Sequence, residues 1–451
     1  MKDLTEGKIS KNLLLFTIPV IFSLTLSRAY TTIDQIMVGK LLGEVSLAAV
    51  GSTSSFLTFF SSLLWGAGMG IPLYIGFLSS KGEKSKTVSA LKSNIVFLAL
   101  VAFTISFLSI VFYKPIFSFL NVNKEIYVDA FKYYAIVTAS KTMATVTACS
   151  NDIFNILGAP SHALKMSVIN CVVNIFLNYL FIKILGYGVT GAAIATFISI
   201  AVVFTINVFA LKKLIKSIST EKSDKKINFH HIKMGWKYAL PCMAQQGVMY
   251  FASLLVQPSI NSLGNSQIAA YSVALTIYNI LTIFFYSASS SVSTFCNQCL
   301  GKGKIHLVKK GFSHGLIIGY CLSLPIIALS LIFPTQLVSL FLQETNGQTA
   351  QFIIRYIALC FPFLPLTIAT NFFHRFFRGI MVPNFALLST VIYSIARIIF
   401  TYLLVPIYFM DGVYWGFILA WACEFIICMI IYLSKKWKNK QYLEIEKAQN
   451  A

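Results

Sequence analysis

Long apolar runs, separated by short polar segments, dominate the chain from end to end. Each run of about 20 apolar residues is long enough to cross a bilayer core of about 30 Å as a helix. Several runs are longer or contain Pro or Gly, which indicates tilted or kinked helices. The pattern predicts an all-α membrane protein with twelve transmembrane helices, near residues 13–39, 47–79, 93–113, 127–157, 164–184, 190–211, 235–260, 268–299, 307–333, 350–377, 382–407 and 413–433.

The second half of the chain repeats the first at an offset near 221 residues. Residues 80–82 recur as 301–303, and Gly158 aligns with Gly379. Such repeats are typical of transporters whose halves are related by an axis along the membrane normal, although a duplication can also be purely architectural. We therefore expect two six-helix lobes with pseudo-two-fold symmetry. The predicted domains are an N-terminal lobe at 1–216, a cytoplasmic linker at 217–233 and a C-terminal lobe at 234–451.

Composition and charge agree with a polytopic protein of the cell membrane. Hydrophobic residues make up 57% of the chain and charged residues 11%, while the net charge is +21. Of the basic residues, 27 lie in alternate loops and at the termini, against 6 in the opposite loops. This asymmetry follows the positive-inside rule, so both termini and the linker are expected in the cytoplasm. The positive charge thus reflects topology, and we expect no nucleic-acid partner.

Motifs for catalysis and for resident cofactors are missing from the sequence. It contains no G-x-x-x-x-G-K-[ST] phosphate loop, no H-E-x-x-H and no closely spaced pair of carboxylates within one span. The nine cysteines have no metal or disulfide-framework spacing. The six histidines lie near predicted cytoplasmic ends, where a solvated surface is the ordinary environment. We therefore expect no enzyme activity and no cofactor, and any uphill transport must use an ion gradient or a separate partner.

Several polar side chains fall at one depth of the predicted first lobe. Asn178 and Thr196 flank a tight turn at 186–188 by eight residues each, about 12 Å below it, and Asp34 lies at a similar level. Asn174 is one helical turn from Asn178 on the same face. Carboxylate, amide and hydroxyl oxygens are the ligands that hard cations prefer. The pattern predicts a site for Na⁺ or H⁺, or else a structural hydrogen-bond cluster.

Other membrane-embedded polar residues allow further interpretations. Asp34 has two candidate ion-pair partners, Arg28 and Lys141. Lys141 lies in the middle of a span and, with Met37 and Met69, is a candidate for the lining of a substrate cavity.

Six short motifs, in this order on a doubled twelve-span frame, resemble the multidrug and toxic compound extrusion (MATE) transporters over almost the full length. The motifs lie at residues 33–39, 47–51, 173–178, 188–193, 297–304 and 376–379. The resemblance implies two six-helix bundles in a V shape that export cationic or amphipathic compounds against entry of Na⁺ or H⁺. We expect the protein to act as a monomer.

The coupling site resembles that of the DinF-like branch of this family. Asp34, Asn174 and Thr196 match its acidic, amide and hydroxyl residues, and Ala192 matches a backbone-carbonyl ligand. The chain departs at Asn178, where many members carry Asp. This leaves one carboxylate where many relatives have two, so the ion that is bound remains open.

The resemblance also indicates that ion coupling does not take place in the C-terminal lobe. The acidic residues that NorM-like members carry in helices seven and ten are replaced by Met249 and Thr367, so coupling is expected in the N-terminal lobe. Pro19 matches a proline at which the first helix bends in some members. The main alternative is a flippase for lipids or lipid-linked sugars in the same superfamily, which Arg28, Lys141 and Arg397 keep open.

Overall fold

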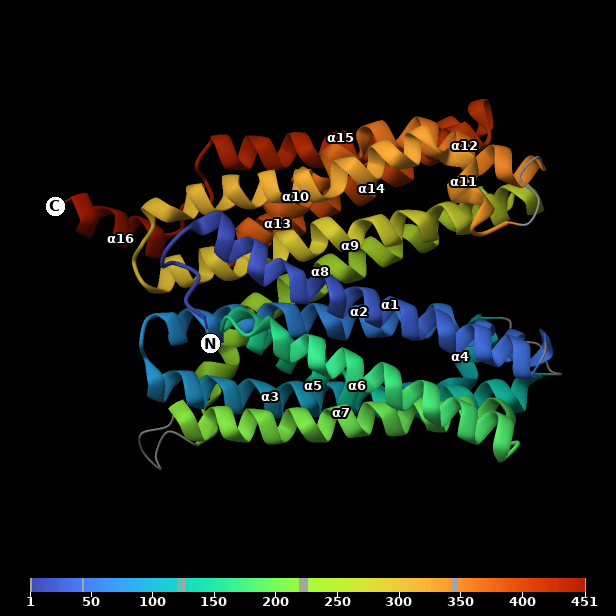
Figure 1. The fold of residues 1–451 in the computed structure, drawn as a ribbon, viewed down its shortest axis with the longest axis horizontal. Coiled ribbons are helices and arrows are strands. Elements are labelled where there is room, and N and C mark those ends of the chain that lie inside the picture. Colours follow the sequence, from blue (N-terminus) through green and yellow to red (C-terminus); the bar gives the residue numbers. More distant parts are fainter. Residues whose placement is uncertain are drawn as a thin grey trace. The chain divides into compact units, whose positions relative to one another are not determined.

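A computed structural model describes residues 2–42, 44–120, 122, 126–218, 226–342 and 347–450. Within these ranges every regular element is a helix (Figure 1). By length and composition, eleven helical segments of the described chain are able to cross a membrane. The predicted all-α membrane fold is therefore confirmed. The elements are α1 Ile9–Leu42, α2 Glu44–Ser80, α3 Lys84–Val111, α4 Tyr113–Phe119, α5 Tyr127–Ile156, α6 Pro160–Asn178, η2 Tyr179–Ile184, α7 Gly188–Ile218, α8 Phe229–Asn261, α9 Asn265–Gly301, α10 His306–Ile332, α11 Pro334–Ser339, α12 Gln348–Cys360, η4 Phe361–Phe363, α13 Leu364–Gly379, α14 Pro383–Tyr408, α15 Met410–Leu433 and α16 Lys440–Asn450.

Of the twelve predicted spans, the one at 127–157 corresponds to α5, which is not among these eleven segments. It is 30 residues long, but Lys132, Lys141 and Asp152 make it less apolar than its neighbours. Because α5 packs against α2, α3, α6 and α7, much of its surface contacts protein rather than lipid. Polar residues are tolerated in such a position.

Contacts divide the chain into two compact units. Unit 1 contains Lys2 and Phe22–Met243, and unit 2 contains Asp3–Ile21 and Ala244–Ala451. The boundaries thus fall inside helices α1 and α8. The described part of the predicted linker at 217–233 belongs to unit 1, and residues 219–225 lie outside the described ranges.

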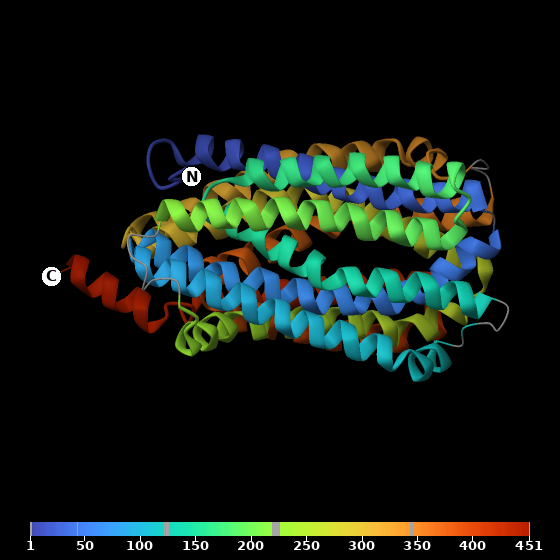
Figure 2. The ribbon, with the colours of Figure 1, turned by 90° about the horizontal axis from the view of Figure 1, so that it is seen from below.

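Within unit 1, small residues bring α2 against the beginning of α8. Gly66 and Gly70 are four residues apart on one face of α2. A Cβ atom on Gly70 would lie 2.4 Å from the Cα atom of Ala239, and one on Gly66 would lie 2.6 Å from the carbonyl oxygen of Cys242. Only glycine fits this close backbone approach, which is the usual basis of helix packing in membranes. Figure 2 shows α6 and α7 of the same unit side by side.

The beginning of α8 is also held by a buried histidine. The Nδ1 atom of His231 lies 2.9 Å from the hydroxyl of Tyr74, and the Nδ2 of Asn94 donates to the His231 carbonyl oxygen at 2.9 Å. His231 is 7% exposed. The expectation of a solvated surface is therefore wrong for this histidine, because α2 and α3 cover it.

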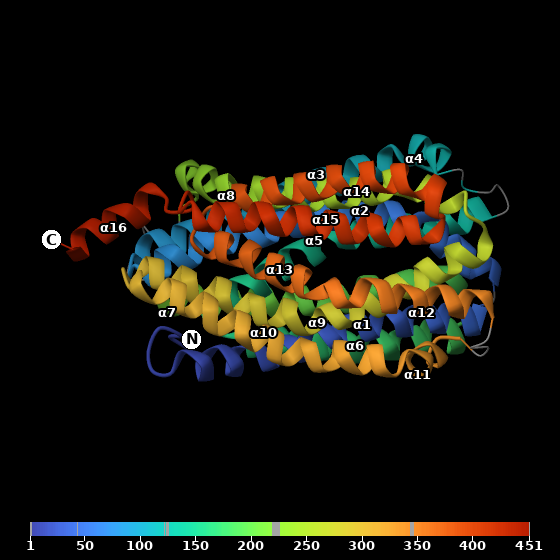
Figure 3. The same ribbon diagram turned by 90° about the horizontal axis from the view of Figure 1, so that it is seen from above.

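In unit 2, the N-terminal segment docks onto the end of α9. The backbone N–H of Leu4 donates to Gln298 Oε1 at 2.9 Å, and the Asp3 carboxylate pairs with Lys302. Burial raises the pKa of Asp3, but hydrogen bonds from Lys302 and Thr5 outweigh burial and lower that pKa below its usual value. Figure 3 shows α14 and α15 of this unit side by side.

The turns of the two halves test the predicted repeat. Gly82 and Gly303 both have positive φ angles, +82° and +73°, and are 221 residues apart as predicted. The positive-φ position after α5 is Gly158, and its counterpart after α13 is Met381, with φ of 63°. The alignment of Gly158 with Gly379 is therefore wrong by two residues. The cause is length, since α5 has 30 residues and the equivalent segment, broken at η4, has 32.

Candidate functional site

Asp34 meets Asn178 inside unit 1. Asp34 lies on α1 and is partly buried, while Asn178 is the last residue of α6 and is fully buried. The Nδ2 of Asn178 donates to Asp34 Oδ1 at 2.6 Å. This short distance is typical of a hydrogen bond to an ionised carboxylate. The sequence predicts similar depths for Asn178, counted from the turn at 186–188, and for Asp34 on the first helix, and the structure brings the two side chains into direct contact.

Asn178 also links the carboxylate to Asn174. Its Nδ2 donates to Asn174 Oδ1 at 3.1 Å, across one turn of α6. Both donor hydrogens of the amide are therefore directed at acceptor oxygens. The Oδ1 atom of Asn178 is buried and, within the described residues, has no hydrogen-bond partner. A buried acceptor without a partner costs about 1–3 kcal/mol, so this oxygen is a candidate ligand for a cation or for a proton donor.

A π-helical segment begins directly after Asn178. Residues 179–184 form η2, which is followed by Gly186 and Gly188, both with positive φ angles. The helix α7 then approaches η2 closely, because a Cβ atom on Gly191 would lie 3.0 Å from the Phe181 carbonyl oxygen. π-Helical turns are rare and occur often at functional sites. Sequence reasoning identified the turn but gave no signal for the π-helix.

Thr196 and Ala192 occupy α7. The hydroxyl of Ser199 donates to the Thr196 carbonyl oxygen at 3.0 Å, and Asn174 Nδ2 lies 3.5 Å from the Ser199 hydroxyl. Thr196 is thus connected to the amides through Ser199 and its own backbone. Ala192 is fully buried in an apolar cluster that includes Tyr133. Ser199 was missed by sequence reasoning, and its position one turn after Thr196 was the available signal.

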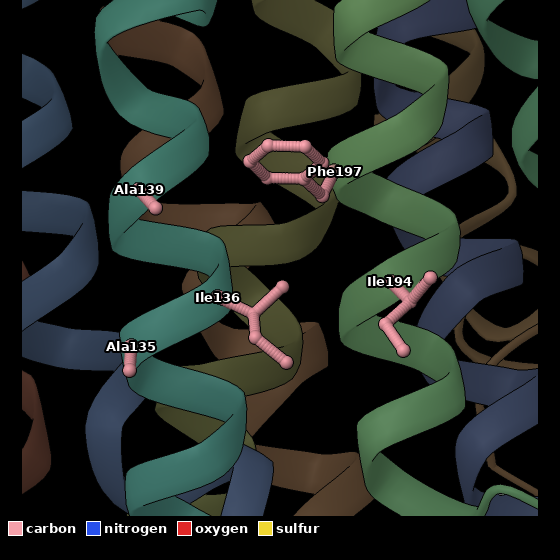
Figure 4. A pocket seen from close by; sticks show the side chains of 5 residues that line it. All are labelled: Ala135, Ile136, Ala139, Ile194 and Phe197. Atoms are coloured by element: carbon pink, nitrogen blue, oxygen red, sulfur yellow. The ribbon is translucent and has the colours of Figure 1, made fainter.

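The residues predicted for a substrate cavity lie on three different helices of unit 1. Met37 on α1 is partly buried, Met69 on α2 is buried, and Lys141 on α5 is partly buried. Unit 1 has an apolar pocket of about 380 Å³ between α5 and α7, and none of these three residues lines it. Figure 4 shows the pocket with its lining residues, which are Ala135, Ile136, Ala139, Ile194 and Phe197.

An ion pair with Arg28 or Lys141 is one alternative to an ion site at Asp34. Among the described residues, Asp34 forms no ion pair with Arg28 or Lys141. In unit 2, Arg397 donates to Ser253 and Tyr271, each at 3.0 Å. No group of three or more His, Cys, Asp or Glu residues that could hold a metal ion occurs in the ranges that the structure describes.

Comparison with known proteins identifies the family. The MatE family model matches residues 19–180 and 241–403, once in each half of the chain. The probable multidrug resistance protein YpnP of Bacillus subtilis is 20% identical over 371 residues, which is 82% of this chain and 83% of that protein. A FAD transporter of Shewanella oneidensis is 22% identical over 321 residues, or 69% of this chain and 70% of that protein.

Solved structures agree with this assignment at the level of the fold. The outward-facing structure of a multidrug resistance MATE family transporter has a TM-score of 0.87 and 20% identity, and the match covers 100% of this chain and 99% of that one. A Vibrio cholerae MATE transporter has a TM-score of 0.89 and 17% identity, covering 96% and 98%. These relatives are membrane transporters rather than enzymes. The chain belongs to the MATE family of multidrug efflux transporters.

Proposed function

We propose that the protein is an antiporter that exports cationic or amphipathic small molecules and is driven by entry of Na⁺ or H⁺ at Asp34. The observation that carries this proposal is the 2.6 Å hydrogen bond from Asn178 to Asp34, beside the unpartnered Oδ1 of Asn178. A carboxylate at membrane depth is costly, so such residues usually bind ions or substrates. The oxygen atoms of Asp34, Asn174 and Asn178 supply a ligand set that suits a hard cation.

The amide of Asn178 offers a way to sense the charge of Asp34. When Asp34 is ionised, the amide donates to it, which is the observed arrangement. When Asp34 is protonated, its O–H becomes a donor and needs an acceptor. A half-turn of the Asn178 amide about its Cβ–Cγ bond would place Oδ1, an acceptor, where Nδ2 now faces Asp34. The same half-turn would direct a third oxygen at Na⁺, so we propose that Na⁺ and H⁺ compete for one site and both favour the rotated amide.

The single carboxylate sets the number of coupling ions that we propose for this site. With Asn at position 178, the site has one negative charge, and one monovalent ion neutralises it. The conformation that opens outward and the one that opens inward would then differ in their affinity for this ion, which is what links ion entry to substrate export. We place both termini in the cytoplasm because the basic residues favour that side by 27 to 6.

The proposal is tested with purified protein in liposomes that are loaded with ethidium as the cationic substrate. An imposed inward gradient of Na⁺ or of H⁺ should drive ethidium transport, and Asp34→Asn should abolish it. Asp129→Asn is the matched control, because Asp129 is exposed in the first turn of α5. FAD is tested as a second cargo, because one relative is named as a FAD transporter.

Each outcome of this experiment decides a separate point. Loss of transport in Asp34→Asn together with full transport in Asp129→Asn would support coupling at Asp34. Full gradient-driven transport in Asp34→Asn would refute it. Transport of FAD without transport of ethidium would overturn the proposed cationic substrate class but leave the coupling site intact.

A further inference from the structure

A second group of buried polar side chains lies in unit 2, on helices α8, α13, α14 and α15. Glu424 is 7% exposed, Gln245 is 5% exposed and Thr390 is 2% exposed. His374 lies in the same group, with its side chain 12% exposed. The expectation of a solvated helix end is therefore wrong for His374. A carboxylate buried among membrane-spanning helices requires partners, and its presence usually has a function.

Four of these side chains form a closed ring of contacts. His374 Nε2 lies 3.4 Å from Glu424 Oε1, and the Thr390 hydroxyl lies 3.5 Å from the same oxygen. Gln245 Nε2 closes the ring, at 2.8 Å from the Thr390 hydroxyl and 3.3 Å from His374 Nδ1. His374 Nε2 also lies 2.8 Å from the hydroxyl of Ser389. The ring joins four helices around one carboxylate.

Arg378 fixes the direction of the hydrogen bonds in this ring. Its guanidinium donates to Gln245 Oε1. Because arginine has only donors, this oxygen must accept, and the NH₂ group of Gln245 must face His374 and Thr390. His374 Nδ1 is then an acceptor, and the ring proton sits on Nε2, toward Glu424 and Ser389. The arginine thereby selects the tautomer with the proton on Nε2, whose N–H donates to the Ser389 hydroxyl and lies 3.4 Å from the Glu424 carboxylate.

This geometry restricts where an added proton can bind. A second proton on His374 would sit on Nδ1, opposite the NH₂ group of Gln245, and two donors would face each other. A proton on Glu424 meets no such conflict, because the Thr390 hydroxyl can accept from it after rotating its own hydrogen. An added proton therefore fits the hydrogen-bond pattern at Glu424 and conflicts with it at His374.

The surrounding groups do not compete for this proton. The charged and titratable side chains in electrostatic contact with Glu424 or with its neighbours come from each adjacent helix. Tyrosine and cysteine are ordinarily neutral near pH 7, and arginine stays charged. The side chains in question are Tyr250 on α8, Tyr271, Tyr278 and Tyr286 on α9, Tyr356 on α12, Arg375 and Arg378 on α13, Tyr393 and Arg397 on α14, and Cys428 on α15.

We propose that Glu424 is a second proton-binding site, which takes up one proton per chain independently of Asp34. The proposal goes beyond antiport at Asp34, since it requires neither that residue nor Na⁺. It adds a site to the half of the chain where none was expected, because Met249 and Thr367 replace acidic residues there. The carboxylate comes from α15 instead.

Infrared difference spectroscopy on protein with ¹³C-labelled glutamate, in lipid nanodiscs, tests the proposal. Between about pH 8 and pH 6 exposed glutamates stay ionised, since their ordinary pKa is about 4.3. A protonated-carboxyl band of labelled glutamate should therefore appear in the wild-type protein. Glu424→Gln should abolish the band and lower proton uptake by about one per chain. Glu83→Gln, which removes a partly exposed carboxylate paired with Lys81 and Lys86, should retain both.

Two further measurements keep the proposal open to refutation if Glu424→Gln does not fold. The absence of any such band in the wild-type protein between about pH 8 and pH 5 would overturn it. Nitrogen NMR of labelled histidine should show that His374 Nδ1 stays unprotonated, and protonation there would move the site to the imidazole. Asp34→Asn should retain the Glu424 band even where it abolishes export, so failure of the antiport proposal and failure of this one are distinguishable.

Discussion

Substituting Asn178 by Asp places a second carboxylate against Asp34. The contact is 2.6 Å, and two unit charges at that distance repel by about 6 kcal/mol at an effective dielectric constant of about 20. Protonating an aspartate of ordinary pKa, about 3.9, costs about 4 kcal/mol at pH 7. Protonation of one carboxylate costs less than the repulsion between two ionised ones. Without Na⁺ the variant should therefore take up a proton and lose about 4 kcal/mol of stability.

A sodium ion between the two carboxylates removes this penalty. Na⁺ affinity should then rise by up to about 1,000-fold, at about 1.4 kcal/mol for each tenfold change. Thermal unfolding of the purified protein in a Na⁺ titration at constant ionic strength measures this directly, because a ligand stabilises the state that it binds. The Na⁺ concentration for half-maximal stabilisation should fall at least tenfold in Asn178→Asp, and the melting temperature without Na⁺ should fall as well.

Asn155→Asp is the matched control. Asn155 Nδ2 donates to Asp152 Oδ1 at 3.3 Å near the end of α5, so the same substitution again places two carboxylates together, away from Asp34. This control should not increase the response to Na⁺. If Asn178→Asp leaves the Na⁺ response unchanged while Asp34→Asn removes it, Asn178 lies outside the ion site and the rotation of its amide is refuted.

Three further predictions concern packing, topology and the N-terminal segment. Gly70→Leu should destabilise unit 1 by about 3 kcal/mol or more, because its side chain would overlap the α8 backbone. Gly51→Leu is the control, because no atom lies within 4 Å of a Cβ at that position. Equal melting temperatures of the two variants would refute the close packing. In a cysteine-free background, an impermeant maleimide applied from outside should label Tyr187→Cys and not Lys226→Cys, and the reverse pattern would invert the topology. Asp3→Asn should cost under about 1 kcal/mol at neutral pH; because the pKa of Asp3 is lowered in the folded protein, this difference should shrink as pH falls through that pKa, and a constant difference would contradict the ion pair.

The bilayer made the helices predictable from the sequence. A spanning helix needs a long apolar run, so the runs could be counted without any knowledge of packing. The polar helix α5 was found because its apolar stretches remained long enough, despite Lys132 and Lys141. The π-helix η2 was not predictable, because it accompanies the approach of Gly191 to Phe181 across a turn. The repeat offset drifted from 221 to 223 where the segment around η4 contains two additional residues.

The candidate site was partly predictable for a geometric reason. The rise per residue fixes depth within a helix, and depth was enough to bring Asp34 and Asn178 to one level. Depth alone does not give the angular position of a side chain, so the role of Ser199 beside Thr196 was missed. The ring around Glu424 depends on four helices meeting, and no single helix pattern indicates it. His374 looked like a surface residue because only its position along the helix was considered.

The division of α1 and α8 between the two units has a mechanical consequence. The chain passes from one unit to the other inside each of these helices, after Ile21 and after Met243. Each crossing lies two residues beyond a proline, Pro19 or Pro241, where the helix lacks a backbone N–H and bends most easily. A loose tether lets its ends turn freely, whereas a helix transmits torque along its axis. Any rotation of one unit therefore strains helices α1 and α8, and each helix is expected to bend at the proline that precedes the crossing.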